Sequence, residues 1–199
     1  MIFQYDRRAC EHLAGRDAAL GAWIERLGKI EREVIPDPFA ALVNSIAGQQ
    51  VSSKAQRTVW ERLRARGLVT PEAILSADER ALRQTGLGEK KALWIRQAAA
   101  RAAELADLAA LSDEEVVARL TTFAGVGRWT AQMLLIFSLN RMDVFSRGDF
   151  GIRKGLALLH GEQAVRDFSL WRTRYAPYGS VASLYLWEIA RVGEGNADI

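Results

Sequence analysis

Apolar side chains recur every three or four residues along most of the chain, and the alternation typical of β-strands is nearly absent. Leu20, Trp23, Ile24 and Leu27, for example, fall on one face of a helix. The same pattern predicts further helices at about 52–66, 89–105, 128–139, 149–160, 162–174 and 178–192. We therefore predict an all-α fold of about ten helices.

Side chains that can cap helix termini mark several boundaries. Ser76 with Glu79 and Ser112 with Glu115 have the spacing of capping boxes, in which each side chain bonds a free backbone amide of the first turn. The second box is expected to open a helix that runs to about Phe123.

The glycine turn at 125–127 separates two predicted helices and brackets one apolar residue, Val126, which can plug the space between them. Its glycines permit positive φ and leave backbone amides uncovered at a helix N-terminus, where the dipole favours an anion. The turn can therefore bind a phosphate, or it can be a plain helix–helix connection with a glycine cap. The segment 86–88, followed by Lys90 and Lys91, is a second candidate of the same kind.

Composition narrows the class of protein. The 199 residues suffice for one large domain or two small lobes that share a cleft, and a net charge of +3 fits a nucleic-acid partner without establishing one. Cys10 is the single cysteine, which excludes an intrachain disulfide and any cysteine-ligated zinc or iron–sulfur site. His12 and His160 lie far apart in the sequence, and we expect both in ordinary surface or helix positions.

The chain carries no uncharged apolar run of the roughly 18 residues that a membrane helix needs. Charged Asp6, Arg7 and Arg8 follow a very short apolar start, so we expect no signal peptide. The expected location is the cytoplasm, at the nucleoid if the organism is prokaryotic.

Several motifs occur in an order that resembles the helix-hairpin-helix (HhH-GPD) DNA glycosylases. They are Phe-Ala-Gly-Val-Gly-Arg-Trp-Thr-Ala at 123–131, Asp-Val-Phe at 143–145 and Gly-Asp-Phe at 148–150. The segment 46–52 is similar to the family's loop that enters the DNA, and 177–187 to its C-terminal helix lining the base pocket. Within the superfamily, the chain most resembles the AlkA-type 3-methyladenine DNA glycosylase II branch.

The resemblance covers about 35–190 and implies an architecture. We expect 1–199 to form a single HhH-GPD domain of two helical lobes, with the active site in the cleft between them and the helix-hairpin-helix at about 113–139. Because the residues before the shared region also have a helical pattern, the N-terminal β-rich domain of some relatives is not expected. The chain then corresponds to a compact form.

The resemblance implies that Asp149 is the catalytic carboxylate. Breaking an N-glycosidic bond builds positive charge on the sugar, and a nearby carboxylate stabilises that charge and can orient a water. Without the resemblance, Asp149 could equally be a helix N-cap and nothing more. The rival carboxylate, Asp143, is interpreted as a structural loop or cap residue.

The resemblance also indicates a monofunctional enzyme. Bifunctional members carry a lysine in the second helix after the hairpin, where its amine forms a Schiff base with the sugar. Trp129 stands at that position here, and the nearest downstream lysine, Lys154, follows Asp149. We therefore expect an abasic product with an intact backbone and no AP-lyase activity.

The base must leave the duplex to reach the carboxylate. Trp129, Phe150 and Trp187 match pocket positions, where aromatic faces can hold a cationic alkylated purine, although each could instead pack in the core. Met133 stands where the best-known relatives carry a tyrosine, so the pocket could be wider or favour different lesions. Tyr185 could compensate, though it lies on a different face of its helix from Trp187.

The remaining site residues concern DNA and ions. Gln50 matches the residue that fills the gap left by the extruded base, although Gln49 and Gln50 could simply cap a helix. The expected DNA contacts are Gln50, Gly125, Val126, Gly127, Arg128 and Thr130. The backbone carbonyls of Thr121, Phe123 and Val126 are candidates for holding a monovalent cation (Na⁺ or K⁺), and no organic cofactor is expected. Gly179 stands where relatives often have arginine, which suggests one lost phosphate or structural contact.

Taken with the resemblance, the sequence predicts a monomeric base excision repair enzyme that flips alkylated purines, of the 3-methyladenine and 7-methylguanine type, out of damaged double-stranded DNA and hydrolyses them. No membrane partner is expected. Two alternatives stay open: a glycosylase of the same fold for a deaminated, etheno or oxidised base, and a non-catalytic DNA-binding module. The second would require a lost carboxylate or a filled pocket.

Overall fold

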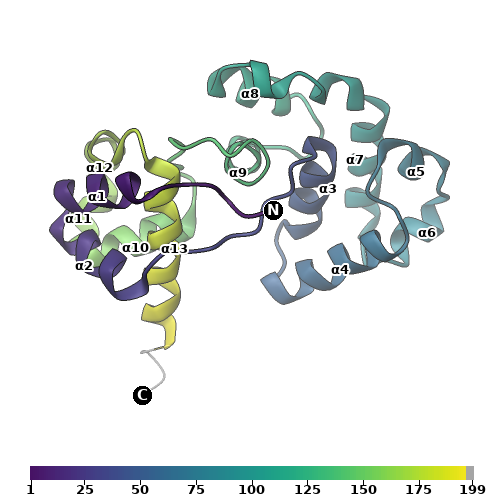
Figure 1. Ribbon diagram of the computed structural model, residues 1–199. Helices are drawn as coiled ribbons and strands as arrows, with labels where there is room; N and C mark the ends of the chain where they lie inside the picture. The colour runs from purple at the N-terminus through teal and green to yellow at the C-terminus, as the bar shows by residue number, and fades with distance from the viewer. Residues whose placement is uncertain (196–199) are drawn as a thin grey trace. The chain divides into compact units, whose positions relative to one another are not determined.

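The computed structural model describes residues 1–195 and confirms the all-α prediction (Figure 1). Within them the chain forms thirteen α-helices and two short 3-10 helices, and its only β-type pairing is an isolated bridge between Ile2 and Glu33. No helix in this described part combines the length and apolar character that crossing a bilayer would require.

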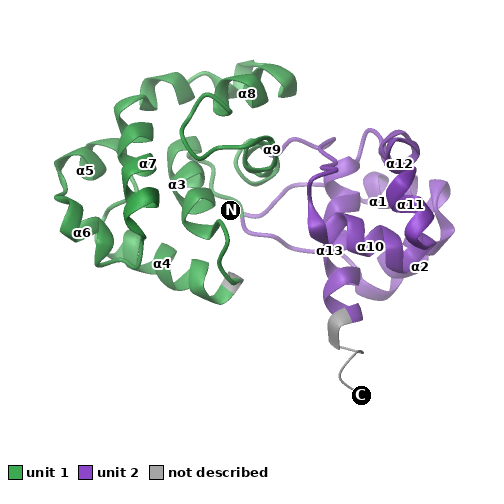
Figure 2. Cartoon of the chain, turned by 180° about the vertical axis from the view of Figure 1, so that it is seen from behind, with its two compact units in different colours: residues 1, 34–139 green, residues 2–33, 140–199 purple. Residues whose placement is uncertain are grey.

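The chain divides into two compact units (Figure 2). Unit 1 contains Met1 and the middle of the sequence, Val34–Leu139. Unit 2 combines the two ends of the chain, Ile2–Glu33 and the residues from Asn140 onward. Residues far apart in sequence therefore share one core in unit 2, whereas unit 1 is nearly continuous.

Unit 1 is organised around α3 (Pro38–Gly48), which packs against α4 (Ser53–Ala65), α7 (Glu89–Ala100) and α9 (Arg128–Phe137). Most of α3 is buried, and Leu42 and Ile46 are fully so, as expected of a helix that is apolar all round. The other elements of unit 1 are α5 (Pro71–Ser76), α6 (Glu79–Arg83), η1 (Ala102–Leu105), η2 (Leu108–Ala110) and α8 (Asp113–Leu120).

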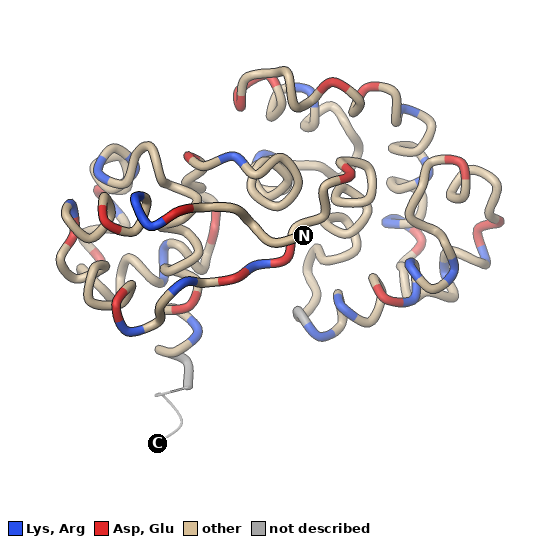
Figure 3. The backbone as a smooth tube through the Cα atoms, viewed as in Figure 1, with Lys and Arg blue, Asp and Glu red and all other residues tan. Residues whose placement is uncertain are grey.

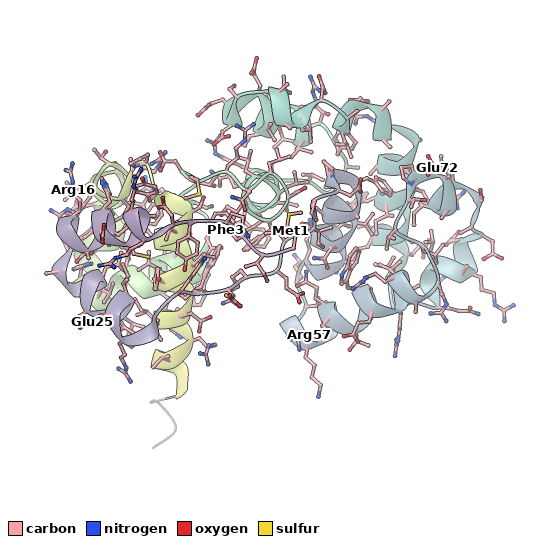
Figure 4. The ribbon with its side chains drawn as sticks, viewed as in Figure 1. Met1, Phe3, Arg16, Glu25, Arg57 and Glu72 are labelled. Carbon is pink, nitrogen blue, oxygen red and sulfur yellow. The ribbon has the colours of Figure 1, made fainter. Side chains whose placement is uncertain are left out.

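Unit 2 is organised around α13 (Gly179–Gly195), which packs against α10 (Phe150–His160) and α2 (Ala18–Leu27). Its remaining helices are α1 (Arg7–Arg16), α11 (Glu162–Arg166) and α12 (Phe168–Tyr175). The extended segment before α1 contributes Phe3, labelled in Figure 4, whose side chain is fully buried.

The structure confirms one predicted capping box and corrects the other. Ser112 caps α8 by accepting a hydrogen bond from the Glu115 amide, while the Glu115 carboxylate accepts one from the Ser112 amide. Ser76, by contrast, is the last residue of α5, and Asp78 caps α6 by accepting from the Ala81 amide at 2.6 Å. Asp78 precedes the helix directly, so its carboxylate competes successfully for the first free amides.

Three predicted helices are shorter than the hydrophobic pattern indicates. The helix expected at 89–105 breaks at Arg101, where the backbone leaves the helical region (φ −113°, ψ 15°). The one expected at 162–174 divides at Asp167, and the one expected to reach Phe123 ends at Leu120. At the first break, the Arg101 guanidinium donates to Thr122 and lies over the Phe123 ring, so a contact distant in sequence accompanies the change of direction.

Asp17 is a buried carboxylate that links three helices of unit 2, α2, α10 and α12. One oxygen, Oδ1, caps α2 by accepting from the Ala19 and Leu20 amides. The other, Oδ2, accepts from the Tyr175 hydroxyl at 2.6 Å and pairs with Nε2 of His160 at 2.8 Å. His160 is the last residue of α10, a helix position as expected, and its ring also stacks on Trp171.

These contacts decide the ionisation of Asp17. Burial alone raises the pKa of its carboxyl, but hydrogen bonds from Tyr175, the Leu20 amide and His160 more than offset that effect and bring the pKa below the usual 3.8. A carboxyl with a lowered pKa in the folded state stabilises the fold above its unfolded pKa, and this stabilisation is lost as pH falls through the folded pKa.

We predict that Asp17→Asn lowers the free energy of unfolding at pH 7 by about 1–3 kcal/mol, because it leaves buried donors without a charged acceptor. The difference from wild type should shrink in acid, once the wild-type carboxyl is itself protonated. Denaturant unfolding at pH 7 and in acid measures both effects. Equal stability of the two proteins at pH 7 would contradict the assignment.

Candidate active site

Asp149 is the N-cap of α10 and is almost completely buried, with 5% of its surface exposed. Its Oδ1 accepts a hydrogen bond from the Ile152 amide at 2.8 Å. The capping role that the sequence offered as an alternative is thus real. It does not exclude chemistry, because a helix N-terminus stabilises a negative charge on the carboxylate that caps it.

Trp187, on α13, donates its indole N–H to the same Oδ1 of Asp149 at 2.9 Å. The structure therefore brings together two residues that the sequence predicted for the site, the carboxylate and one aromatic. The hydrogen bond between them was not predicted, because the pattern of either helix alone does not show how closely the two approach.

Two glycines one turn apart on α10 make that approach possible. A Cβ at Gly151 would lie 2.6 Å from Cδ1 of Trp187, and one at Gly155 would lie 2.4 Å from the carbonyl oxygen of Leu186. Both distances are shorter than non-bonded atoms tolerate, so any larger residue would push α13 away from α10. The spacing of these glycines is the sequence signal that could have indicated the contact.

Asp143 lies in the loop before α10 and takes a structural role, as interpreted from the sequence. Both of its oxygens accept from the Arg172 guanidinium at 2.8 and 2.9 Å, and Oδ1 also accepts from the Gly179 amide at the start of α13. A Cβ at Gly179 would lie 3.0 Å from that oxygen and 3.1 Å from Cβ of Phe145. The glycine that departs from the family pattern therefore allows α13 to begin directly against this loop.

The glycine turn at 125–127 connects α8 and α9 in unit 1. Gly125 has φ +77°, a conformation that favours glycine, and its Cβ would lie 2.2 Å from Cε3 of Trp94 on α7. Val126 is buried, as expected of a plug, and its amide donates to the Phe123 carbonyl. Both the backbone and the packing therefore require glycine at 125.

Gly127 is the N-cap of α9 and supplies no side-chain cap. The first amides of a helix have no carbonyl four residues earlier within the helix to bond, and they point outward at its N-terminus. The Arg128 side chain is exposed at this end of α9. The buried Thr130 hydroxyl accepts a hydrogen bond from Gln49. The arrangement is that of an anion site built from main chain.

Two of the three aromatic residues predicted for the base pocket, Trp129 and Phe150, do not pack in the core. Trp129 in unit 1 is 42% exposed, and Phe150 in unit 2, directly after Asp149, is 67% exposed. Trp187 is half-buried. Met133 is buried, with 7% exposed, on α9 of unit 1.

The suggestion that Tyr185 compensates for Met133 was wrong. Tyr185 is fully buried in unit 2, where its hydroxyl donates to the Gly28 carbonyl and lies within 3.5 Å of Tyr5 Oη and Cys10 Sγ. Burial and these neighbours raise its pKa. The side chain therefore serves the core that joins α13 to the N-terminal segment.

Gln50 lies between α3 and α4, exposed and with φ +55°. A residue other than glycine in this left-handed region costs about 1–2 kcal/mol, so its neighbours must hold it there. Gln49 is the C-cap of α3, as the capping alternative allowed, whereas Gln50 projects from the loop that we call the wedge loop, residues 49–52.

The helix that follows the wedge loop is basic, which the sequence analysis did not single out. In α4, Lys54, Arg57, Arg62 and Arg64 outnumber the single acid, Glu61 (Figure 3). Arg57, labelled in Figure 4, extends away from the helix into solvent. This helix adds positive charge to unit 1 beyond what the net charge of the chain suggests.

The ion ligands that the sequence suggested are backbone carbonyls. In the described part of the chain, no group of three His, Cys, Asp or Glu side chains is placed to hold a metal. Of the carbonyls considered for a monovalent cation, those of Thr121, Phe123 and Val126, the Phe123 carbonyl already accepts from Val126, and a carbonyl oxygen has one further lone pair.

Comparison with known proteins is consistent across sequence and structure. Residues 43–167 match the profile of HhH-GPD superfamily base excision DNA repair proteins. DNA-3-methyladenine glycosylase 1 of Schizosaccharomyces pombe is 32% identical over 170 residues, which cover 79% of this chain and 75% of that protein.

Two solved structures have the same fold over nearly their whole length. The crystal structure of a DNA-3-methyladenine glycosidase from Bacillus halodurans superposes with a TM-score of 0.79 at 32% identity, covering 96% of this chain and 92% of that one. The S. pombe 3-methyladenine DNA glycosylase in complex with abasic DNA gives a TM-score of 0.78 at 31% identity, covering 91% and 95%.

We predict that Gly151→Ala lowers the free energy of unfolding by about 1–3 kcal/mol, because its methyl group must displace Trp187 or separate α10 from α13. Gly15→Ala on α1 is the matched control: no atom lies within 4 Å of a Cβ there, and alanine should stabilise a helix by about 0.5–1 kcal/mol. Thermal unfolding compares the two. If Gly151→Ala were as stable as Gly15→Ala, the close contact would be disproved.

Proposed function

Because the chain belongs to the HhH-GPD superfamily of base excision DNA repair proteins, we propose that it is a monofunctional DNA glycosylase for alkylated purines of the 3-methyladenine and 7-methylguanine type. It hydrolyses the N-glycosidic bond of these bases in damaged duplex DNA. The names of its relatives support this substrate class. The observation that carries the proposal is the buried Asp149 carboxylate, fixed at a helix N-terminus by the Trp187 indole.

The chemistry follows from how Asp149 is held. Two donors, the Ile152 amide and the Trp187 indole, fix Oδ1 and so fix the plane of the carboxylate. These two donors account for two of the roughly four lone-pair sites of a carboxylate. As the base departs, the negative charge stabilises the oxocarbenium-like sugar, and the carboxylate orients the water that attacks it.

The leaving group needs little help. A purine alkylated at these ring nitrogens is cationic and departs neutral, so a general acid is not essential. Within unit 2, the exposed ring of Phe150 and the half-buried ring of Trp187 supply π-faces that attract such a base by about 0.5–2 kcal/mol each.

Binding to duplex DNA is assigned to unit 1. The N-terminus of α9, where Gly127 supplies no side-chain cap, and the Arg128 side chain hold a backbone phosphate, assisted by a monovalent cation on the turn carbonyls. Basic α4 adds charge-dependent attraction. Gln50 enters the space left by the extruded base and hydrogen-bonds the orphaned partner. We propose that the enzyme works as a monomer on damaged double-stranded DNA, in the cytoplasm and at the nucleoid if the organism is prokaryotic.

We predict that Asp149→Asn lowers single-turnover excision of 7-methylguanine from duplex DNA by at least roughly 10²-fold, while affinity for the duplex stays within about threefold. Asparagine is an equally good N-cap and can still accept from Ile152 and Trp187, so the fold is preserved. Release of free base by chromatography and binding by fluorescence anisotropy measure the two. Excision at the wild-type rate would end the assignment.

We also predict no covalent adduct between enzyme and DNA. Trp129 offers no amine at the position of the lyase lysine, so borohydride should trap nothing and the product strand should break only after alkali treatment. A bifunctional glycosylase on its own substrate serves as the positive control. An adduct at a level comparable to that control would show that the enzyme is a lyase.

A further inference from the structure

Lys91, in the first turn of α7, turns its ammonium group to the C-terminal end of α3 rather than to solvent. Its Nζ donates to the Ala47 carbonyl at 2.8 Å and to the Gln49 carbonyl at 2.6 Å. These are among the last carbonyls of α3, which carry no partner within the helix and attract a cation. Burial lowers the pKa of Lys91. Lys91 therefore does not match the sequence expectation of a phosphate contact beside 86–88.

Gln49 continues this connection towards the glycine turn. Its Nε2 donates to the Gly125 carbonyl at 2.8 Å and to the Thr130 hydroxyl at 3.3 Å. One side chain thus bonds the chain on both sides of the α9 N-terminus. The backbone of Gln49 is held by Lys91, so α7, the end of α3 and the glycine turn are linked through a single residue.

The next residue is Gln50, exposed and in the left-handed region at φ +55°. On its other side, Ser52 begins α4 by accepting from the Ala55 amide, and Gln56 of α4 donates to Asn44 of α3. The ends of the wedge loop are therefore fixed, and the strained residue at its tip is held by bonds made one residue earlier.

We infer that Lys91 and Gln49 are positioning residues that hold Gln50 in the conformation that enters the duplex and keep it in register with the phosphate-binding glycine turn. This inference rests on the proposed function. Neither side chain touches the lesion; both act through Gln50. Their loss should therefore impair extrusion of a paired base more than the chemical step that follows it.

Single-turnover excision of 7-methylguanine tests this with two substrates, one with the lesion paired to cytosine and one with it opposite an abasic site, where extrusion costs less. Lys91→Met and Gln49→Met should each slow release of the paired lesion by about 10-fold or more. For the lesion without a partner base, we expect a loss of less than about threefold. Lys91→Arg, which retains donors for both carbonyls, should recover much of the rate.

Lys90→Met is the matched control, because this substitution removes the same charge from the same helix. The Lys90 side chain is exposed and lies over the Trp94 ring. Its ratio of paired to partnerless excision should equal that of wild type. A double-mutant cycle provides the second criterion: Gln50→Ala with Lys91→Met should be no slower than Gln50→Ala alone. Thermal unfolding identifies any variant that fails to fold. If Lys91→Met does not fold, the excision rates of Gln49→Met and Lys91→Arg on the two substrates test the inference.

Equal losses on both substrates, or losses that multiply in the double mutant, would overturn the inference. If wild type releases no base at all, the proposed function fails instead. The role of Lys91 is then decided by duplex DNA containing 2-aminopurine, whose fluorescence rises when the base is extruded. Wild type should produce that rise and Lys91→Met should not, and an equal rise with both would refute the positioning role.

Discussion

The carboxylate of Asp149 depends on the close approach of α13 to α10. A buried carboxylate is costly unless donors surround it, and here one donor comes from the backbone of its own helix and the other from an indole on α13. The indole reaches it because Gly151 and Gly155 carry no side chains between the helices. The same glycines that fix the packing of unit 2 thus fix the orientation of the candidate catalytic group.

In unit 1, the proposed DNA contact also depends on main-chain groups and on glycine. The anion site that we propose there consists of backbone amides at the start of α9, so a phosphate contact would need no cluster of lysines, which agrees with a net charge of only +3. Two features require glycine at 125: its positive φ, and the Trp94 ring, which occupies the place that a Cβ would take. Gln49 and Lys91 then connect this turn to the loop that carries Gln50.

Some features set by neighbouring residues were predictable from the sequence, whereas features set by distant contacts were not. The Ser112–Glu115 box involves one helical turn and was predicted correctly. The break at Arg101 was missed because its side chain meets Thr122 and Phe123, about twenty residues away. The catalytic role of Asp149 was predicted through resemblance to a family, since its capping position alone is shared by many aspartates.

The contacts made by Trp187, Tyr185 and Lys91 could not be predicted from the sequence for the same reason. The periodic pattern of 178–192 predicted a helix but could not tell which face Trp187 would present to α10. Tyr185, two residues earlier, proved to be a core residue of unit 2. Lys91 resembled a DNA-binding lysine by its position after a glycine turn, whereas its ammonium is occupied by the end of α3. In each case the deciding atom belongs to a residue far away in the sequence.

Affinity for two abasic-site analogues tests most directly whether Asp149 stabilises a sugar cation. Duplex DNA with a pyrrolidine in place of the sugar carries a positive charge where the oxocarbenium ion would form, and a tetrahydrofuran site has the same shape without the charge. Wild type should bind the charged analogue about 10-fold or more tightly than the neutral one, and Asp149→Asn should bind both equally. The same preference in both proteins would mean that the charge is recognised by another group.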